Sequence, residues 1–359
     1  MPPKKKSTTR RRRGNRTPTN RRRSTLDEDA NTVVSVEEAD ERSNSAPKGC
    51  TDTELLAAVT PFVEKLEKTT LEQFKEEYAA LKAIPLSEAT FTAFEANRPK
   101  NRYTDQFCID QTRVKLTFNV PPDSDYIHAN HVNVEGHSYN MICTQGPVQS
   151  SVADFWRMVY QEKCFAIVML CKFIEGKRPK CEPYYPDEAG KIETYGPLMV
   201  RHGGPAPGSD RSYEKLVLDV GRVGEPFVPE HTVILVSYDK WPDKSVPTSS
   251  MALHRVLRFL RTQAKDKTIV VHCSAGVGRT GTFAALSVVE SRISEKKAFD
   301  VFEIVKNLRQ KRFNSVQTEI QYLFIHKAIA DYLNAKKIRT DKFNAMYFAH
   351  TRGQPITEG

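Results

Sequence analysis

The chain has 359 residues, of which 39% are hydrophobic, 54 are Lys or Arg and 44 are Asp or Glu. This length fits one large globular domain or two small ones. Its longest apolar runs, such as 165–170, are far shorter than the ~20 residues of a membrane span, so we expect no transmembrane segment. The start of the chain lacks a secretory apolar core and the seven cysteines are odd in number, which favours reduced thiols in the cytoplasm or the nucleus.

The positive charge is confined to the start of the chain. Residues 1–23 hold three Lys and eight Arg without an acid, and the remaining 43 basic residues are balanced by 44 acidic ones. Residues 1–48 also lack hydrophobic periodicity, so we expect a disordered basic and acidic tail. Residues 4–23 fit an acidic partner, such as an import receptor, a nucleic acid or an anionic lipid. One alternative stays open, in which the acids of 27–41 fold back and neutralise the tail.

The rest of the chain alternates between helical and strand-like patterns. Residues 54–84 are helical in pattern, with Thr69 and Glu72 spaced as a capping box. Strands are expected at 114–118, 126–134, 139–143, 166–171, 213–220, 232–238 and 268–272. Further helices are expected at 152–162, 249–262, 279–294, 301–310 and 317–333. This order predicts a single α/β domain over 50–335, with a mixed sheet flanked by helices, and a polar C-terminal tail over 336–359.

The most informative stretch is 269–282, where an apolar strand ends at Cys273, a glycine-rich loop follows and Arg279 begins an apolar helix. Gly276 and Gly278 let the loop curl so that backbone N–H groups point inward. The start of the helix adds a positive dipole, and the guanidinium of Arg279 is a two-pronged donor for phosphate oxygens. These features predict a phosphate-binding loop.

The same surroundings favour the thiolate form of Cys273, which would attack phosphorus and form a phosphocysteine. The glycines at 276, 278 and 281 also match a dinucleotide-binding fingerprint, but that loop does not begin with a reactive cysteine. A papain-like pair with His272 is excluded, because adjacent residues at a strand end project to opposite sides. An inert, buried cysteine in a glycine-rich turn is the remaining alternative.

The run from His272 to Gly281 resembles the signature of the protein tyrosine phosphatases, specifically the phosphotyrosine-specific non-receptor-type catalytic domain, and the resemblance extends over about 71–333. It implies a cysteine-phosphatase domain with a highly twisted mixed sheet, phosphotyrosine-containing proteins as substrates, and neither cofactor nor metal. His272 would support the loop. The phosphate would be bound by Ser274, Ala275, Gly276, Val277 and Gly278.

Trp241-Pro242-Asp243 resembles the mobile acid loop of that family. The resemblance implies that Asp243 protonates the leaving tyrosine oxygen and later accepts a proton from water. The segment around Tyr103 and Asp105 resembles the substrate-recognition loop. There Tyr103 would stack on the phosphotyrosine ring, and Asp105 would accept hydrogen bonds from the substrate backbone. When the family is set aside, an Asp after Trp-Pro is more often a turn residue than a catalyst, and the alternative for the segment around Tyr103 is a polar surface turn.

Gln317 and Gln321 resemble the family's glutamine loop, in which Gln317 would position the hydrolytic water and Gln321 would contact the substrate. Glu175 would pair with Arg279, and Lys180 would support the acid loop. Thr280 would donate its hydroxyl to the departing thiolate. Arg309 and Arg312 match the family only as framework positions.

The chain departs from the family pattern at a few positions. Lys244 and Ser245 follow Asp243 where an aromatic residue or His and then Gly are common, and the loss of Gly is expected to stiffen the acid loop. Tyr185 stands where Trp is usual, and His128 where Asn is frequent. The main hypothesis is therefore an active phosphotyrosine phosphatase, and the alternative is a pseudophosphatase that binds phosphotyrosine without hydrolysing it.

Overall fold

A nine-stranded mixed sheet is the centre of the computed structural model, which describes residues 52–208 and 210–351. Its strands lie in the order β1-β2-β3-β11-β4-β10-β9-β8-β7. The four central strands β3, β11, β4 and β10 are parallel, and the strands on both sides pair antiparallel. The mixed α/β fold expected from the sequence is therefore confirmed. The predicted N-terminal tail lies outside the described residues.

The strands and helices are numbered in chain order. The strands are β1 (Arg113–Lys115), β2 (Tyr126–His131), β3 (Asn140–Thr144), β4 (Ala166–Met169), β5 (Ile174–Glu175), β6 (Arg178–Pro179), β7 (Ile192–Tyr195), β8 (Leu198–Pro205), β9 (Glu214–Arg222), β10 (His231–Ser237) and β11 (Thr268–His272). The α-helices are α1 (Thr53–Lys68), α2 (Leu71–Ala83), α3 (Thr92–Ala96), α4 (Val152–Gln161), α5 (Met251–Gln263), α6 (Gly278–Ser294), α7 (Val301–Lys311), α8 (Glu319–Ala335) and α9 (Asp341–Thr351).

The central strand β11 carries the residue on which the site depends. Its run Ile269-Val270-Val271 is fully buried, because β3 pairs with one edge of the strand, β4 pairs with the other, and helices cover the sheet. β-branched residues favour such a strand, and ligand sites of parallel sheets form beyond the carboxyl ends of the strands. Cys273 follows β11 at that end.

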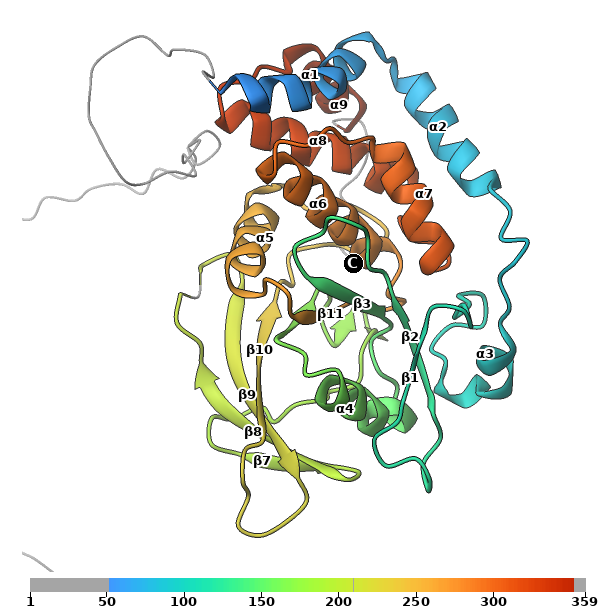
Figure 1. Cartoon of the computed structure of the whole chain (residues 1–359), viewed down its shortest axis with the longest axis vertical. Coiled ribbons are helices and arrows are strands. Elements are labelled where there is room, and N and C mark those ends of the chain that lie inside the picture. Colours follow the sequence, from blue (N-terminus) through green and yellow to red (C-terminus); the bar gives the residue numbers. More distant parts are fainter. Residues whose placement is uncertain (1–51, 209, 352–359) are drawn as a thin grey trace, which may run out of the picture. The chain divides into compact units, whose positions relative to one another are not determined.

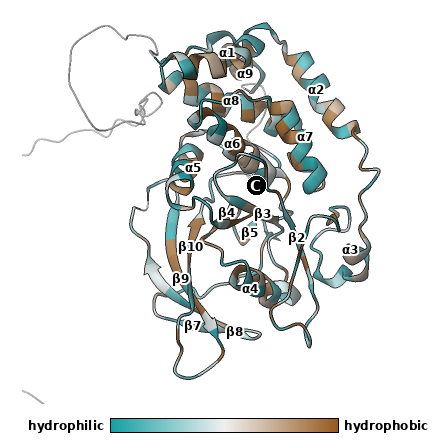
Figure 2. Ribbon diagram, in the orientation of Figure 1, coloured by the Kyte–Doolittle hydropathy of each residue, from teal (hydrophilic) through white to brown (hydrophobic). Residues whose placement is uncertain are grey.

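The helices lie in two groups about the sheet. Figure 1 shows α6, α7, α8 and α9 gathered with α1, whereas α4 lies apart and packs against β2, β7 and β8. Almost every residue of α6 is buried, because this helix runs between the sheet and α7 and α8. Figure 2 shows apolar residues concentrated on the central strands and α6, while the outward faces of the surrounding helices are more polar.

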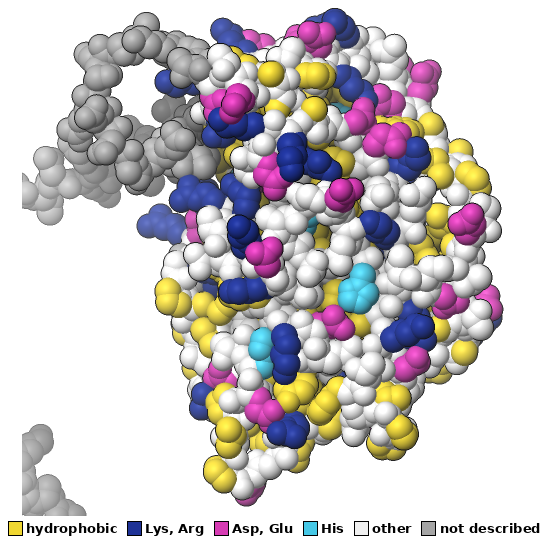
Figure 3. Space-filling view, viewed as in Figure 1, with side chains coloured by type: hydrophobic (Ala, Val, Ile, Leu, Met, Phe, Trp, Pro, Cys, Tyr) yellow, Lys and Arg dark blue, Asp and Glu magenta, His cyan; other side chains and the backbone are white. Residues whose placement is uncertain are grey.

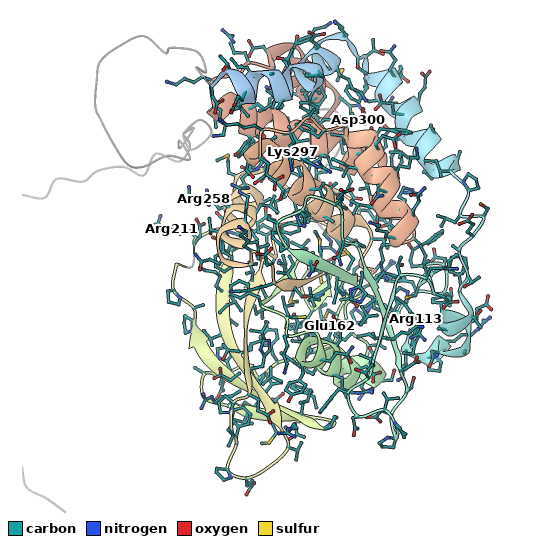
Figure 4. The ribbon with its side chains drawn as sticks, viewed as in Figure 1. Arg113, Glu162, Arg211, Arg258, Lys297 and Asp300 are labelled. Carbon is teal, nitrogen blue, oxygen red and sulfur yellow. The ribbon has the colours of Figure 1, made fainter. Side chains whose placement is uncertain are left out.

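The helix boundaries are set by side-chain caps. The helical segment expected over 54–84 forms α1 and α2, and the capping box of α2 uses Thr70 and Gln73 rather than Thr69 and Glu72. The carboxylate of Asp300 accepts the N–H of Glu303 at 3.1 Å and so begins α7 (Figure 4). These caps satisfy N–H groups that have no partner within their own helix.

The C-terminal segment differs from the polar tail expected over 336–359. Its residues 341–351 form α9, which contacts α1 and α8. Phe343 is fully buried, with its ring centroid 5.6 Å from that of Phe74, and Tyr347 is also buried. The domain thus extends through α9, because two aromatic side chains gain burial only when the helix docks. Residues 352–359 lie outside the described part.

The surface of the described part carries both signs of charge. On the face in Figure 3, Lys and Arg side chains are interspersed with Asp and Glu. This agrees with the balanced charge of the chain beyond its first 23 residues. Within 52–208 and 210–351, no helix is long and apolar enough to cross a membrane.

Candidate active site

The loop between β11 and α6 places Cys273 at the base of a cleft. The Cys273 side chain is 3% exposed, and its Sγ accepts the N–H of Gly276 at 3.3 Å. Gly276 has a φ of +70°, and a Cβ there would lie 2.0 Å from the carbonyl oxygen of Thr144. Only glycine fits this turn, which aims a backbone N–H at the sulfur.

Arg312 holds the same loop from behind. Its Nε donates to the carbonyl of Gly276 at 3.1 Å, and its Nη2 donates to the carbonyl of Ala275 at 3.0 Å. Because these carbonyls are drawn toward the guanidinium, the N–H groups of the loop are left to face the cleft. The fully buried Arg312 therefore acts as an internal anchor for an anion-binding loop.

His128 completes the support of Arg312. Its Nδ1 accepts from Arg312 Nη1 at 3.0 Å, and its Nε2 donates to the carbonyl of Gln106 at 2.7 Å. This tautomer is inferred from the two partners. Burial, together with the charge of Arg312, lowers the pKa of His128 to about 3, so the ring is neutral at physiological pH.

The guanidinium of Arg279 is held by hydrogen bonds from its two Nη atoms, while its Nε–H has no partner in the described part of the chain. Its two Nη atoms donate to the carboxylate of Glu175 at 2.6 and 3.1 Å, and Nη1 also donates to the carbonyl of Trp241 at 2.9 Å. The buried Nε has no partner among the described residues. Burial opposes the charge of Arg279, but the Cys273 sulfur and Glu175 outweigh it and raise the pKa. The side chain thus presents a charged, unpaired N–H, as oxyanion binding requires.

Asp243 lies within the same group of charges. Its Oδ2 is 2.6 Å from Lys180 Nζ, and its Oδ1 is 3.3 Å from Arg279 Nη2. Burial favours the neutral acid, but the hydrogen bond from Lys180 and the charge of Arg279 outweigh it and lower the pKa. The carboxylate is therefore ionised at neutral pH when the cleft holds no substrate.

The acid loop is bound to the glutamine loop through backbone oxygens. Trp241 Nε1 donates to the carbonyl of Ser245 at 2.8 Å, and Gln321 Nε2 approaches the same oxygen at 3.5 Å. Lys244 adopts a φ of +56°, in the left-handed region that glycine favours. Lys244, which stands where an aromatic residue or His is common, thus has a locally strained backbone.

The cleft above Cys273 has a volume of about 390 Å³. It is lined by Tyr103, Asp105, Gln106, Arg178, Pro179, Lys180, Asp243, Lys244, Cys273, Ser274, Ala275, Gly278, Arg279 and Gln317. The Tyr103 hydroxyl lies 2.8 Å from Ser274 Oγ, which itself donates to the carbonyl of Lys180 at 2.9 Å. Tyr103 therefore donates to Ser274, and its ring is fixed beside the entrance to the loop.

Comparison with known proteins decides the family. A family model described as protein-tyrosine phosphatase matches residues 97–331. The chain belongs to the protein-tyrosine phosphatase family. This confirms the family predicted from the run around Cys273.

Relatives of the phosphatase domain include receptor and non-receptor proteins. The chain is 34% identical over 290 residues to receptor-type tyrosine-protein phosphatase eta of Gallus gallus, covering 79% of this chain and 20% of that protein. It is 37% identical over 252 residues to tyrosine-protein phosphatase non-receptor type 9 of Homo sapiens, covering 66% of this chain and 42% of that protein. The chain thus spans between about a fifth and two fifths of these relatives.

A solved structure also shares the phosphatase fold. Its title concerns the structural basis of the PTPN18 fingerprint on distinct HER2 tyrosine phosphorylation sites. The match has a TM-score of 0.70 and 29% sequence identity, and it covers 77% of this chain and 99% of the other. The likeness therefore extends over the whole of that chain.

Most of the phosphatase residues predicted from the sequence meet in the cleft. Those that line it are Tyr103, Asp105, Lys180, Asp243, Cys273, Ser274, Ala275, Gly278, Arg279 and Gln317. Glu175 and Trp241 support the cleft by holding Arg279. His272 is buried and lies 2.9 Å from the Tyr184 hydroxyl through its Nε2, so it supports the loop from the side of the sheet.

Four of the residues predicted for catalysis or substrate binding do not line the cleft, namely Gly276, Val277, Thr280 and Gln321. Gln321 is fully buried, and its Oε1 accepts the N–H groups of Gln317 and Thr318 at 3.0 and 3.2 Å. This side chain joins the two loops and does not line the cleft, so direct contact with substrate is not supported. Thr280 Oγ1 is buried and has no hydrogen-bond partner among the described residues, so its bond to Cys273 stays a prediction. Gly276 and Val277 are buried within the loop and also do not line the cleft, although the N–H of Gly276 donates to Cys273 Sγ.

Proposed function

We propose that this chain hydrolyses phosphotyrosine in proteins through a phosphocysteine intermediate. The observation that supports the proposal most is the unpaired Arg279 Nε beside the buried Cys273 sulfur, with the Asp243 carboxylate in the same cleft. A nucleophile, an oxyanion donor and a proton donor are thus within one binding site. Because the chain spans only part of its curated relatives, its activity is inferred from its own residues.

In the first step, the Cys273 thiolate forms a bond to phosphorus while the bond between phosphorus and the tyrosine oxygen breaks. The leaving oxygen takes the proton of Asp243. The loop N–H groups and Arg279 stabilise the charge on the phosphoryl oxygens. In the second step, water attacks phosphorus, the sulfur leaves as thiolate, and Asp243 accepts a proton from the water. Gln317 lines the cleft where it is able to orient that water.

Protonation of Asp243 is coupled to substrate binding. In the empty cleft, Lys180 and Arg279 hold Asp243 as a carboxylate. A phosphate dianion draws the same two cations to its own oxygens and adds negative charge beside Asp243. Both effects raise the pKa of Asp243, since a like charge disfavours the ionised form. Asp243 is therefore protonated, and able to act as an acid, when the substrate's leaving group is present.

Selectivity for phosphotyrosine follows from the depth of the cleft. The Tyr103 hydroxyl is bound to Ser274 in the loop, so the Tyr103 ring forms a fixed wall beside the phosphate site. An aromatic substrate ring gains contact area against this wall. A phosphoserine side chain lacks the length to bring its phosphate to the buried Cys273 sulfur.

The alternative of a non-hydrolysing phosphotyrosine-binding protein is not favoured. Its basis was the loss of glycine at the hinge of the acid loop. Ser245, which stands at the glycine position, is not among the described residues with a positive φ, so this loop conformation does not require glycine there, and Asp243 remains within the cleft. The relatives are also named as phosphatases. No catalytic group expected of the family is missing from this chain.

The test is hydrolysis of a phosphotyrosine peptide by the full chain in the presence of EDTA, beside a phosphoserine peptide of the same sequence. We expect turnover of the phosphotyrosine peptide alone, and its loss in Cys273→Ser with phosphopeptide affinity retained. Cys108→Ser is the matched control, because Cys108 Sγ lies 3.6 Å from two oxygen acceptors that a hydroxyl can use. Binding without turnover by the wild-type chain contradicts the proposal.

For the basic segment we infer, from its charge alone, an acidic partner for residues 4–23 and a location in the cytoplasm or the nucleus. Eleven cations without an acid within residues 1–23 support this. The segment lies outside the described residues. Fluorescent fusions with and without residues 1–23 test it, and an unchanged distribution after the deletion contradicts it.

A further inference from the structure

The rim of the active-site cleft carries cations that have no acidic partner in the described part of the chain. Arg178 on β6 and Lys244 in the acid loop are both exposed and line the cleft. Neither side chain makes an ion pair or a side-chain hydrogen bond among the interactions of residues 52–208 and 210–351. The neighbouring Lys180 differs, since it is paired with Asp243 at 2.6 Å.

The nearby carboxylates are already occupied. Glu175, which pairs with Arg178 in the β5–β6 register, gives both of its oxygens to Arg279. Asp243 is shared between Lys180 and Arg279. Apart from Asp243, Asp105 is the only acid among the described residues that lines the cleft. The rim thus has a net positive charge that the protein itself leaves uncompensated, a pattern that attracts anions.

Both cations come from backbone segments that the site holds in place. Arg178 belongs to a two-stranded hairpin whose Glu175 is clamped by Arg279. Lys244 directly follows Asp243, and its carbonyl oxygen lies 3.4 Å from Thr318 Oγ1. A substrate group bound by these side chains is therefore held at a defined place relative to Cys273, and contact with Lys244 also acts on the acid loop.

We propose that Arg178 and Lys244 form an anion subsite that binds an acidic side chain next to the phosphotyrosine of the substrate. The inference rests on the proposed phosphotyrosine hydrolysis and narrows its substrate class. The shared chemistry is an anionic group, supplied by Asp or Glu or by a second phosphorylated residue. The phosphotyrosine itself is bound deeper, by the loop and by Arg279, so these two outer cations remain for another group.

The expected effect is moderate, because both cations are exposed to solvent. An exposed ion pair contributes about 0.2–1 kcal/mol, which is roughly 1.4- to 5-fold in kcat/KM for each cation. If the two contributions add, the cations together are expected to favour an acidic peptide by roughly 2- to 25-fold. The preference falls when the salt concentration rises, since added ions screen exposed charges.

The experiment measures kcat/KM for a phosphotyrosine peptide flanked by Ala and for variants with Glu at each position from three before to three after. The most favourable position is then filled with phosphoserine, which distinguishes a carboxylate from a second phosphate. Wild type, Arg178→Gln and the double variant Arg178→Gln/Lys244→Gln are compared. Lys265→Gln is the matched control, because Lys265 is exposed and lies at the opposite end of β11 from Cys273.

We expect one or more Glu positions to raise kcat/KM over the Ala peptide in the wild-type chain and in Lys265→Gln. The ratio of Glu to Ala peptide falls in Arg178→Gln and approaches 1 in the double variant. In Arg178→Glu, a Lys peptide becomes better than the Glu peptide. The use of ratios separates recognition from any general loss of activity, since both peptides meet the same variant.

Two results overturn the subsite. One is the absence of any Glu or phosphoserine preference in the wild-type chain, and the other is an equal loss of preference in Lys265→Gln and Arg178→Gln. Both leave phosphotyrosine hydrolysis intact. If the wild-type chain hydrolyses none of the peptides, including the Ala parent, it is the proposed function that fails.

Discussion

Lys180 and Asp243 form an ion pair of 2.6 Å inside the cleft, joining the β5–β6 hairpin to the acid loop. The pair stabilises the charged form of an aspartate that must carry a proton to act as an acid. It therefore sets the pH range in which the free enzyme is competent.

Removal of Lys180 is expected to shift the pH dependence of kcat/KM. Lys180 lowers the pKa of Asp243, so Lys180→Met raises that pKa. Activity that needs protonated Asp243 is lost as pH rises through this pKa, so the basic limb of the profile moves to higher pH. Lys172→Met is the control, because Lys172 lies just before the same hairpin, is exposed and makes no ion pair with any residue of 52–208 or 210–351. If the basic limb of the pH profile is unchanged in Lys180→Met, the ionisation of Asp243 does not set that limb.

Gly276→Ala tests the geometry of the loop. The new Cβ meets the carbonyl oxygen of Thr144 at 2.0 Å, so the loop must shift and kcat/KM is expected to fall by about 100-fold or more. Gly190→Ala is the control that separates the effect of the steric clash from the effect of placing alanine at a positive φ. Gly190 has a φ of +86° with nothing within 4 Å of the added Cβ, so we expect only about 1 kcal/mol of lost stability. Similar activity in the two variants contradicts the account of the loop.

Arg312→Lys tests the anchor behind the loop. Lysine keeps the positive charge but loses the planar fork that holds the carbonyls of Ala275 and Gly276. The loop N–H groups are then free to turn away, and we expect kcat/KM to fall by about 100-fold. Vanadate, an oxyanion that binds the loop directly, provides the second measurement. An unchanged inhibition constant for vanadate argues against this role.

His128→Asn tests whether the lowered pKa of His128 makes the free energy of unfolding fall as the pH becomes acid. Because burial lowers the pKa of His128 to about 3, the unfolded chain binds a proton near pH 6.5 that the folded chain does not. The stabilisation is complete above pH 6.5 and is lost as pH falls toward 3, by about 1.4 kcal/mol per pH unit. His137 and His326, whose pKa values are lowered by burial to about 4, act in the same direction. Urea unfolding from pH 7 to 5 is expected to show a shallower pH dependence in His128→Asn, and an equal slope contradicts it.

Much of the site was accessible from the sequence, because its chemistry is concentrated in short runs. The strand, Cys273, glycine-rich loop and Arg279 are adjacent in the chain, and each restricts the others. The role of Arg312 was not predictable beyond a framework match. It depends on contacts between α7 and a loop more than thirty residues earlier, which no local pattern records.

The elements that the sequence analysis missed depend on tertiary packing. Six of the eleven residues of α9 are apolar, but they do not form one regular stripe, and Phe343 is buried only because α1 and α8 form a surface for it. β7 and β8 were not predicted, and this region is interrupted by Gly196, Pro197 and two glycines at 203–204. β8 nevertheless alternates between buried and more exposed residues along its length, which is a signal that identifies a half-buried strand.

The position of Gln321 shows how a residue's type fails to fix its role. A glutamine one helical turn from Gln317 reads as a second substrate contact. In the structure its side chain caps the start of α8 and reaches the acid loop through the carbonyl of Ser245. Whether Gln321 points into the cleft or caps α8 depends on where α8 begins, and the spacing between Gln317 and Gln321 does not determine this.

The most direct test is rapid acid quench of the full chain during turnover of a phosphotyrosine peptide labelled with ³²P, followed by mapping of the label. Gln317→Ala is included, because slower hydrolysis of the intermediate increases its amount. The account predicts label on the peptide that contains Cys273, more of it in Gln317→Ala, and none in Cys273→Ser. Turnover without label at Cys273, or label on another residue, contradicts it.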